Sequence, residues 1–304
     1  MKISILGGAG VVGSTSAYRI AQGGTASEIV LFDVRHRLAE AHAFDIDQSV
    51  VYRAATRVRA GGIADCANSD VIVLAAPQHD ANVTKPGHFA SHASRVLEVV
   101  EPLVAKSPSA FWIITTNPVD ALVYLIHREL SLPRNKVIGL NRNDSARFRW
   151  AVAKVLSVPS TAVEAITLGE HGKTQVPLFS SIRVNGKPFP LSRKQIDAIR
   201  DEATSFLIRW TELNPGRTAG WATGESVGDI VSTMALDDGR AVPCSMSLEG
   251  EYGLRDVSLG VPVKLGQTRV KEVVELPLAP WEQKGLESSA EAIRAMIEAF
   301  RDHE

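Results

Sequence analysis

Two short motifs in this sequence carry side chains that together could oxidise an alcohol or reduce a ketone. Gly169-Glu170-His171-Gly172 supplies an imidazole, and Asp144-Ser145-Ala146-Arg147 supplies a carboxylate and a guanidinium. A carboxylate can hold an imidazole in one tautomer, and a guanidinium can bind a substrate carboxylate through two parallel hydrogen bonds. If Asp144 opens a helix, Arg147 lies one turn further along it, and both side chains can reach the same cleft. Taken singly, such residues are more often helix caps, surface ion pairs or turn residues, so the interpretation as a redox site for a hydroxy acid depends on the combination.

The beginning of the chain has the pattern of a dinucleotide-binding turn. The apolar run Lys2 to Leu6 ends in Gly7-Gly8-Ala9-Gly10-Val11-Val12-Gly13, which contains G-x-G-x-x-G, and the helical stretch Ser14 to Ala21 follows. In such a turn the first glycine allows a sharp bend, the second lets the backbone approach a diphosphate, and the third lets the helix pack closely on the strand. The phosphates then lie at the helix N-terminus. We therefore expect the cofactor to be bound by Gly8, Gly10, Val11, Val12 and Gly13.

The choice between NAD and NADP depends on the end of the next strand. A second apolar run, Glu28 to Phe32, ends in Asp33, which lies 20 residues after Gly13. A carboxylate at this position would accept hydrogen bonds from the adenosine ribose hydroxyls and repel a 2′-phosphate, so NAD is favoured over NADP. Arg35 and Arg37 lie just beyond and could soften that preference, although such arginines are more often solvated.

The composition fits an enzyme and argues against several other classes. With 304 residues, of which 45% are hydrophobic, the chain can bury a large core in two lobes. A net charge of −1 gives no reason to expect nucleic acid or a membrane as a partner. Cys66 and Cys244 stand far apart without C-x-x-C spacing, which is typical of buried free thiols in a reducing compartment. Because there is neither a signal peptide nor a run of roughly 18 apolar residues, we expect a cytoplasmic protein.

The first half alternates strand-like and helix-like segments, as a parallel sheet with crossover helices requires. We predict an α/β fold with an open, doubly wound Rossmann-type sheet and a ligand crevice at the carboxyl ends of its strands. Ala75 and Asn117 follow two of these strands. We expect Ala75 to contact the cofactor and the amide of Asn117 to reach substrate or cofactor, although Asn117 could also be a turn residue before proline. The predicted strands are Lys2 to Leu6, Glu28 to Phe32, Thr56 to Ala60, Asp70 to Ala75, Ala110 to Thr115 and Lys136 to Leu140, and the helices between them are Leu38 to Val50, Ala90 to Lys106 and Val119 to Leu130.

The second half is predicted to be an α+β substrate domain. Ser192 to Leu213 is predicted to be one long helix, opening with Ser192 and Gln195 in capping-box spacing. Further helices are expected over Gly220 to Leu236 and at the C-terminus. The domains are predicted as residues 1–142 for the cofactor and 143–304 for catalysis. The long helix has an apolar stripe predicted to be core, made of Ile196, Ile199, Ala203, Phe206, Leu207 and Trp210, and the strands expected to complete this lobe are Arg240 to Leu248, Val257 to Lys264 and Val270 to Leu276.

In the order of its motifs the sequence resembles the lactate/malate dehydrogenase family over nearly its whole length. The resemblance runs through the glycine turn, Asp33, Thr116-Asn117-Pro118-Val119-Asp120 and the motifs around Asp144 and His171. Two further stretches are similar to the archaeal-type malate dehydrogenase branch, Leu248-Glu249-Gly250-Glu251-Tyr252-Gly253 and Gly260-Val261-Pro262. The resemblance implies NAD as the cofactor and a 2-hydroxy or 2-oxo acid as the substrate.

The same resemblance implies a role for each motif residue. His171 would accept and donate the proton, Asp144 would be its partner, Arg147 would anchor the substrate carboxylate, and Asn117 would bridge substrate and nicotinamide. Relatives form dimers or tetramers, so the resemblance also implies a homodimer or homotetramer, with the helix Leu38 to Val50 as a candidate contact surface.

One loop departs from the family pattern. Between Ala76 and Ala93 the family usually has one arginine that selects the substrate and another that polarises its carbonyl, but this chain has Asp80 and Pro86 at the aligned positions. Lys85 could supply the missing charge, as could a protonated histidine, His79 or His88. Asp80 would repel the second carboxylate of malate by roughly 1 kcal/mol or more, so a neutral, polyhydroxylated or cationic side group is expected, unless the loop folds differently and Asp80 faces solvent.

Asn143 also departs from the family pattern, because relatives generally have leucine there. It indicates a more polar substrate pocket than that of a lactate enzyme.

Two other functions remain open. The chain could be a regulatory protein that binds NAD without turnover. It could also be an NAD- and metal-dependent enzyme of related fold, since His88 and His92 have i, i+4 spacing and lie near His79. Histidines on a loop are usually solvated and no H-E-x-x-H motif is present, so we expect no metal.

Overall fold

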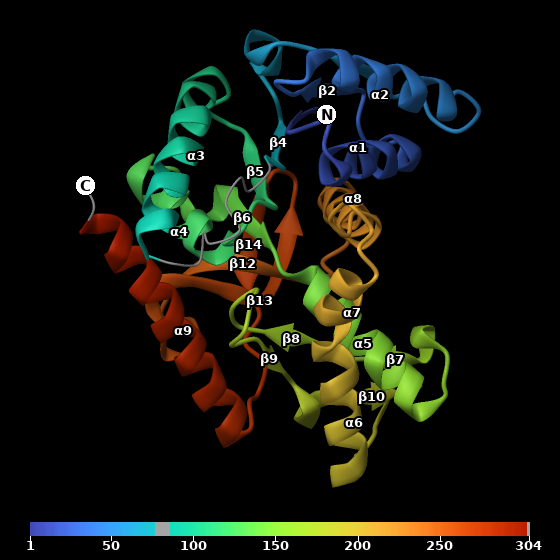
Figure 1. Ribbon diagram of the computed structural model, residues 1–304, viewed down its shortest axis with the longest axis vertical. Helices are drawn as coiled ribbons and strands as arrows, with labels where there is room; N and C mark the ends of the chain where they lie inside the picture. The colour runs from blue at the N-terminus through green and yellow to red at the C-terminus, as the bar shows by residue number, and fades with distance from the viewer. Residues whose placement is uncertain (77–85, 303–304) are drawn as a thin grey trace.

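A large mixed β-sheet with helices on both faces forms the body of the protein (Figure 1). This computed structural model describes residues 1–76 and 86–302. Six parallel strands of the described residues lie in the order β3-β2-β1-β4-β5-β6. The order reverses between β1 and β4, and ligands of such sheets bind at the carboxyl ends of the strands beside that point. The predicted doubly wound sheet is thereby confirmed, with strands β1 (Lys2–Leu6), β2 (Glu28–Phe32), β3 (Arg57–Ala60), β4 (Val71–Leu74), β5 (Phe111–Ile114) and β6 (Val137–Leu140).

Two groups of helices cover the sheet (Figure 1). On one side lie α1 (Val11–Gly23), α2 (His36–Ser49) and α8 (Trp221–Leu236), and on the other lie α3 (Pro86–Lys106), α4 (Val119–Glu129) and α9 (Pro280–Arg301). Three glycines spaced by four, Gly220, Gly224 and Gly228, let α8 approach α1 closely, because a Cβ on any of them would lie within 2.1 to 2.7 Å of an atom of α1. None of these helices, nor any other in the described part of the chain, is long and apolar enough to cross a membrane. Cys66 and Cys244 are buried free thiols, as predicted.

Three strands of the second half join the sheet of the first half. They are β12 (Ala241–Glu249), β13 (Arg255–Gly266) and β14 (Arg269–Val273), and β12 pairs antiparallel with β6 through Cys244 opposite Leu140. They were expected to complete the lobe of the second half, and in the structure they extend the sheet of the first half instead of forming a sheet of their own. The physical reason is that every residue of β6 is buried, so β6 could not have remained the open edge of the sheet.

The remaining second-half elements form a smaller unit around α5 (Arg142–Leu156), with its own core that includes Phe148, Val163 and Ile199. The division of the chain into residues 1–142 and 143–304 stays a prediction. The other elements of this unit and of the chain segment leading to α9 are β7 (Val163–Glu164), β8 (Thr167–Leu168), β9 (Val176–Pro177), β10 (Arg183–Val184), β11 (Lys187–Pro188), α6 (Arg193–Thr204) and α7 (Phe206–Glu212). Short 3-10 helices are η1 (Ile63–Cys66), η2 (Arg134–Lys136), η3 (Ser160–Ala162), η4 (Phe179–Ser181) and η5 (Glu251–Gly253).

The helix predicted over Ser192 to Leu213 is in fact two helices, α6 and α7, which meet at Ser205. The capping box at Ser192 is confirmed, with the Gln195 N–H donating to the Ser192 hydroxyl. At the break, the hydroxyls of Thr204 and Ser205 donate to carbonyls one turn back. Of the apolar stripe, Ile199 is fully buried, whereas Phe206 and Trp210 are only partly buried and are available for other contacts.

Candidate active site

The carboxylate of Asp144 brings the imidazole and the guanidinium together. Asp144 lies in the first turn of α5, and its Oδ2 is 2.5 Å from Nδ1 of His171. Its Oδ1 accepts a hydrogen bond of 3.2 Å from Arg147, one turn along the same helix. The Asp144 side chain is 4% exposed, whereas those of His171 and Arg147 are 18% and 32% exposed. A buried carboxylate thus holds two side chains that solvent, and hence a substrate, can reach.

His171 follows strand β8 in a loop that is fixed to the sheet. Gly169 exchanges two backbone hydrogen bonds of 2.9 Å with Gly260 on β13. Its φ of +84° favours glycine, and a Cβ there would lie 2.6 Å from the hydroxyl of Ser289 on α9. Asn141, directly before α5, donates to the Gly169 carbonyl at 3.2 Å. These bonds tie the His171 loop to the start of the helix that carries its partner.

A second carboxylate, Asp120, supports the backbone of His171. Oδ2 of Asp120 accepts the His171 N–H at 2.7 Å, and Asp120 is 1% exposed. Burial raises the pKa of Asp120 from 3.8 to about 7, which the Ser245 hydroxyl and the His171 N–H offset only in part. In the sequence Asp120 is only the last residue of the Thr116-Asn117-Pro118-Val119-Asp120 motif, and nothing in the spacing of a helix residue indicates that it accepts a backbone N–H from a distant loop.

The environment favours the charged form of His171. Burial by itself lowers the pKa of the imidazole, but the charge and the hydrogen bond of Asp144 outweigh it, and the charge of Asp120 acts in the same direction. Arg147 opposes them more weakly. The pKa of His171 therefore lies above its ordinary value of 6.5.

Asn117 lies at the end of β5, three residues before Asp120, and is exposed. Its carbonyl oxygen is 3.1 Å from Nε2 of His92 on α3. His92 is therefore engaged with the backbone that precedes α4, while His79 lies outside the described residues. Over the ranges 1–76 and 86–302, no group of three or more histidine, cysteine or acidic side chains could hold a metal ion.

Asn143 occupies a buried position between α5 and α8. Its amide nitrogen donates to the Thr223 hydroxyl at 3.0 Å, and its amide oxygen accepts from the Ser226 hydroxyl at 2.7 Å. Both polar ends therefore contact α8, and these bonds lend no support to the expected contact with substrate, which stays a prediction. Asp80 and Lys85, the loop residues expected to contact substrate, lie outside the described residues.

The glycine turn after β1 is shaped to hold a diphosphate. Gly10 precedes α1 and no side chain caps this helix, so the first N–H groups of α1 remain for a ligand. A Cβ on Gly10 would meet only the Gly7 carbonyl, at 3.2 Å, whereas a Cβ on Gly13 would lie 2.2 Å from that oxygen. Gly13 thus closes the turn against β1, and Gly10 leaves space on its open side. Among the predicted cofactor residues, Val11 and Val12 start α1, and Ala75 is nearly buried beside Gly7 at the end of β4.

Asp33 supports this turn from the end of β2. Its two oxygens accept the Ala9 N–H at 3.0 Å and the Arg35 N–H at 2.9 Å. The guanidinium of Arg35 lies 3.4 Å from the same carboxylate, and its side chain is 56% exposed. A carboxylate can accept hydrogen bonds from the adenosine ribose hydroxyls, and the N–H groups of an uncapped helix N-terminus can donate to a diphosphate, so these residues fit a nicotinamide dinucleotide.

Comparison with known proteins agrees with this geometry. The lactate/malate dehydrogenase NAD binding domain matches residues 1–139, and the lactate/malate dehydrogenase alpha/beta C-terminal domain matches residues 142–304. The chain belongs to the lactate/malate dehydrogenase family. A malate dehydrogenase of Halobacterium salinarum is 36% identical over 301 residues, which cover 98% of each chain. A malate dehydrogenase of Flavobacterium johnsoniae is 32% identical over 310 residues, covering 99% of each.

Solved structures of the lactate/malate dehydrogenase family share the fold over almost the whole chain. Malate dehydrogenase from Salinibacter ruber has a TM-score of 0.91 at 30% identity and covers 99% of this chain and 98% of its own. The minor L-lactate dehydrogenase from Enterococcus mundtii has a TM-score of 0.89 at 27% identity, with 98% and 97% covered. The family's nicotinamide cofactor is consistent with the glycine turn described above.

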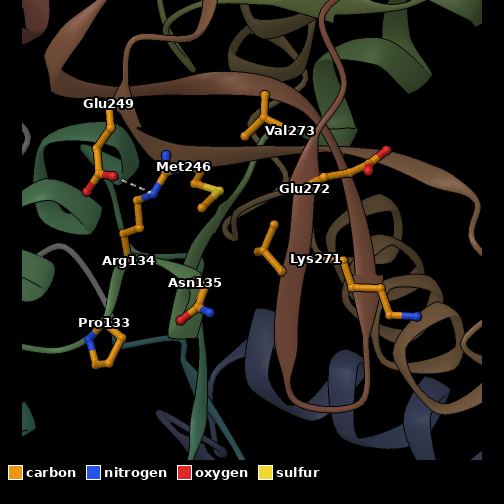
Figure 2. Close-up of a pocket in the computed structure, with 9 residues that line it drawn as sticks. Pro133, Arg134, Asn135, Met246, Glu249, Lys271, Glu272 and Val273 are labelled. Atoms are coloured by element: carbon orange, nitrogen blue, oxygen red, sulfur yellow. Dashed lines mark ion pairs between the residues drawn. The ribbon is translucent and has the colours of Figure 1, made fainter.

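A hollow of about 280 Å³ lies between η2, β12 and β14, apart from the candidate active site around Asp144 (Figure 2). Each charged side chain that lines it has an ion-pair partner. Arg134, for example, lies 3.1 Å from Glu249 and 2.9 Å from Glu251. Because none of the predicted site residues lines this hollow, we do not assign the active site to it. The other lining charges, Lys271 and Glu272, pair with Asp237 and Lys264.

Proposed function

We propose that this protein transfers a hydride between NAD and a 2-hydroxy or 2-oxo acid, and that malate is not its preferred substrate. As a member of its family it is an NAD-dependent 2-hydroxy acid dehydrogenase. The observation that carries the proposal is the contact of one buried carboxylate, Asp144, with both His171 and Arg147. That contact couples a proton acceptor to an anchor for the acid group.

The chain's own residues handle the proton and the substrate. Because Asp144 occupies Nδ1 of His171, Nε2 is the ring nitrogen that takes the hydroxyl proton during oxidation and returns it during reduction. Asp144 orients the imidazole and stabilises its charged form. Arg147 binds the carboxylate as a fork, which fixes the orientation of the carbinol carbon, and the amide of Asn117 is proposed to bind the reacting oxygen.

NAD, when bound, would supply the nicotinamide ring that exchanges the hydride. The residues that would hold it are Gly8, Gly10, Val11, Val12, Gly13, Asp33 and Ala75. We infer a preference for NAD over NADP because the Asp33 carboxylate would repel a 2′-phosphate.

The sequence of the loop disfavours malate. The relatives named above as malate dehydrogenases are similar over the whole chain, yet Asp80 stands where the family resemblance leads us to expect a substrate-selecting arginine. A carboxylate facing the second carboxylate of malate would repel it. We therefore propose a substrate whose side group is neutral, polyhydroxylated or cationic, and Lys85 as the cation that polarises its carbonyl.

A substrate screen tests this proposal. The purified protein is assayed with NAD and with NADP against malate, lactate, polyhydroxylated and amino-substituted 2-hydroxy acids, and in reverse against their 2-oxo acids. We expect turnover with NAD that collapses by about 10²- to 10⁴-fold in His171→Asn, while cofactor binding is retained. Reduction of oxaloacetate in preference to the other 2-oxo acids would refute the exclusion of malate. Cofactor binding without any turnover would favour the regulatory function, and loss of turnover with a chelator would favour the metal-dependent one.

We also propose a homodimer or homotetramer. On and just after α2 several apolar side chains are exposed, among them Phe44 at 70% and Tyr52 at 99%. Exposed apolar side chains gathered on and beside one helix are typical of surfaces between subunits. Light scattering of the wild type and of Phe44→Glu tests this, and a monomeric wild type would refute it.

A further inference from the structure

A column of aromatic and guanidinium groups begins at the candidate carboxylate anchor and follows α7. The guanidinium of Arg147 lies over the ring of Phe206, 4.7 Å from its centroid. Phe206 stacks on Trp210 one turn later, with centroids 6.0 Å apart and ring planes 27° from parallel. The guanidinium of Arg217 then lies 5.7 Å from the Trp210 ring. We call these four residues the α7 column.

The ring of Phe206 restricts the guanidinium of Arg147. One nitrogen of Arg147 donates to Asp144, and one face of the planar group is covered by the Phe206 ring. A planar cation that is held at one edge and covered on one face keeps its orientation, while its remaining N–H groups are directed outward in the plane. The orientation of the anchor therefore depends on α7 as well as on Asp144.

The far end of the α7 column is tied to the dinucleotide turn. The Trp210 indole N–H donates to the Arg217 carbonyl at 3.2 Å, which holds the loop after α7 against the helix. That loop ends at Gly220, where a Cβ would lie 2.1 Å from Cγ1 of Val11. The hydroxyl of Thr15 on α1 also donates to the Gly220 carbonyl, at 3.1 Å. The contact with the helix that would receive the cofactor diphosphate is thus made through Gly220, at the opposite end of the α7 column from Phe206.

We propose that Phe206 is a positioning residue that sets the plane of Arg147 and thereby the affinity of the site for the carboxylate of a 2-oxo acid. This rests on the proposed function and adds to it a determinant on α7, outside the loop that departs from the family pattern. Because the ring acts on the anchor and touches neither the proton acceptor nor the dinucleotide turn, its loss weakens substrate binding and leaves cofactor binding intact. Replacing a cation–ring contact of this kind changes affinity by about 5- to 10-fold.

The test compares Phe206→Leu, Phe206→Tyr and Trp150→Leu with the wild type. Trp150 is the matched control, because it lies on the same helix as Arg147 and its ring is paired with a different cation, Lys154, whose Nζ lies 5.0 Å from the ring centroid. KM and kcat are measured with the best 2-oxo acid of the screen, and calorimetry measures binding of oxamate, a non-reacting carboxylate, to the protein saturated with NADH.

We expect Phe206→Leu to raise KM and the oxamate Kd by about 5- to 10-fold while kcat stays within about 2-fold of the wild type. Phe206→Tyr, which keeps an aromatic ring, should have the KM and Kd of the wild type. Trp150→Leu should change neither value. Unchanged KM and Kd in Phe206→Leu overturn the proposal. Equal weakening of NADH and oxamate also overturns it, because it would show a general structural role. Wild-type protein that binds oxamate without any turnover would refute the proposed function alone, and the calorimetric comparison would still decide the role of Phe206.

Discussion

The carboxylate of Asp144 lies 2.5 Å from Nδ1 of His171, which leaves Nε2 as the nitrogen for a substrate hydroxyl. The other oxygen of the same carboxylate accepts a hydrogen bond from Arg147. Asp144 therefore serves both halves of the proposed reaction, because it orients the proton acceptor and fixes one edge of the carboxylate anchor. Substitution of this one residue should disturb proton transfer and substrate binding together.

Asp144→Asn should lower the pKa of His171, because the charge of Asp144 is the largest influence that raises it. Reduction of a 2-oxo acid needs the protonated imidazole, so kcat/KM for reduction should fall as pH rises through a pKa above 6.5 in the wild type, and at a lower pH in the variant. We also expect a loss of about 10²- to 10⁴-fold in kcat/KM. The measurement is kcat/KM for reduction from pH 5 to 9. An unshifted profile would show that another group controls the protonation of His171.

Asp120→Asn should stabilise the protein at alkaline pH. In the unfolded chain the carboxyl titrates near its ordinary value of 3.8, but in the folded protein it holds its proton up to about pH 7. Between these values the folded state binds more protons than the unfolded state, so the wild type loses stability as pH rises, and the amide does not. The Asn oxygen can still accept the His171 N–H.

The comparison for Asp120→Asn is the thermal midpoint of both proteins at pH 5 and pH 8. The variant should gain on the wild type at pH 8 and much less at pH 5. Above about pH 7, where Asp120 is charged, its pH profile for reduction should also shift down, by less than that of Asp144→Asn, because the charge of Asp120 raises the pKa of His171 more weakly than Asp144 does. Equal thermal midpoints of the two proteins at pH 8 would mean that burial does not raise the pKa of Asp120.

The parts of the fold that could be predicted from sequence are those that depend on local pattern. Strands β4 and β5 are short runs in which every residue is apolar and buried, bounded by polar or turn residues, and such runs indicate an interior parallel strand. The motifs around Asp144 and His171 were predicted to converge because a carboxylate, an imidazole and a guanidinium form a redox site for a hydroxy acid only in combination. Their contacts in the structure agree with that prediction.

The parts that could not be predicted depend on partners distant in the chain. The apolar pattern of β12 identifies a strand but does not identify β6 as its neighbour, so the joining of the two sets of strands into one sheet was not predicted. The contact between Asp120 and the His171 backbone joins residues 51 positions apart, and no spacing of residue types in the sequence predicts it. The break at Ser205 interrupts a stretch whose apolar periodicity continues from α6 into α7, so the sequence pattern does not reveal it.

Asp33→Asn should weaken the preference for NAD. The amide removes the charge that would repel a 2′-phosphate and frees Arg35, whose guanidinium lies 3.4 Å from the carboxylate in the wild type. We expect the ratio of kcat/KM for NAD to that for NADP to fall by about 10-fold or more, since hydrogen bonds to a charged group are the stronger ones. The double variant Asp33→Asn with Arg35→Ala is the control and should lose the gain with NADP. An unchanged ratio in Asp33→Asn would place the adenosine ribose elsewhere.

Gly10→Ala and Gly13→Ala should separate cofactor binding from stability, because the two glycines differ in what surrounds them. Gly10 has φ −77°, which alanine adopts without strain, and its Cβ would meet only one atom, at 3.2 Å. Gly10→Ala should therefore keep the thermal midpoint of the wild type while its methyl group blocks the approach of the diphosphate and abolishes NAD binding.

At Gly13 a Cβ would lie 2.2 Å from the Gly7 carbonyl oxygen and 2.9 Å from Cα of Gly8, so α1 must move away from β1. Gly13→Ala should lose about 2 kcal/mol or more of stability. Calorimetry with NAD and thermal unfolding of both variants provide the comparison, and normal NAD binding by Gly10→Ala would contradict the position proposed for the diphosphate.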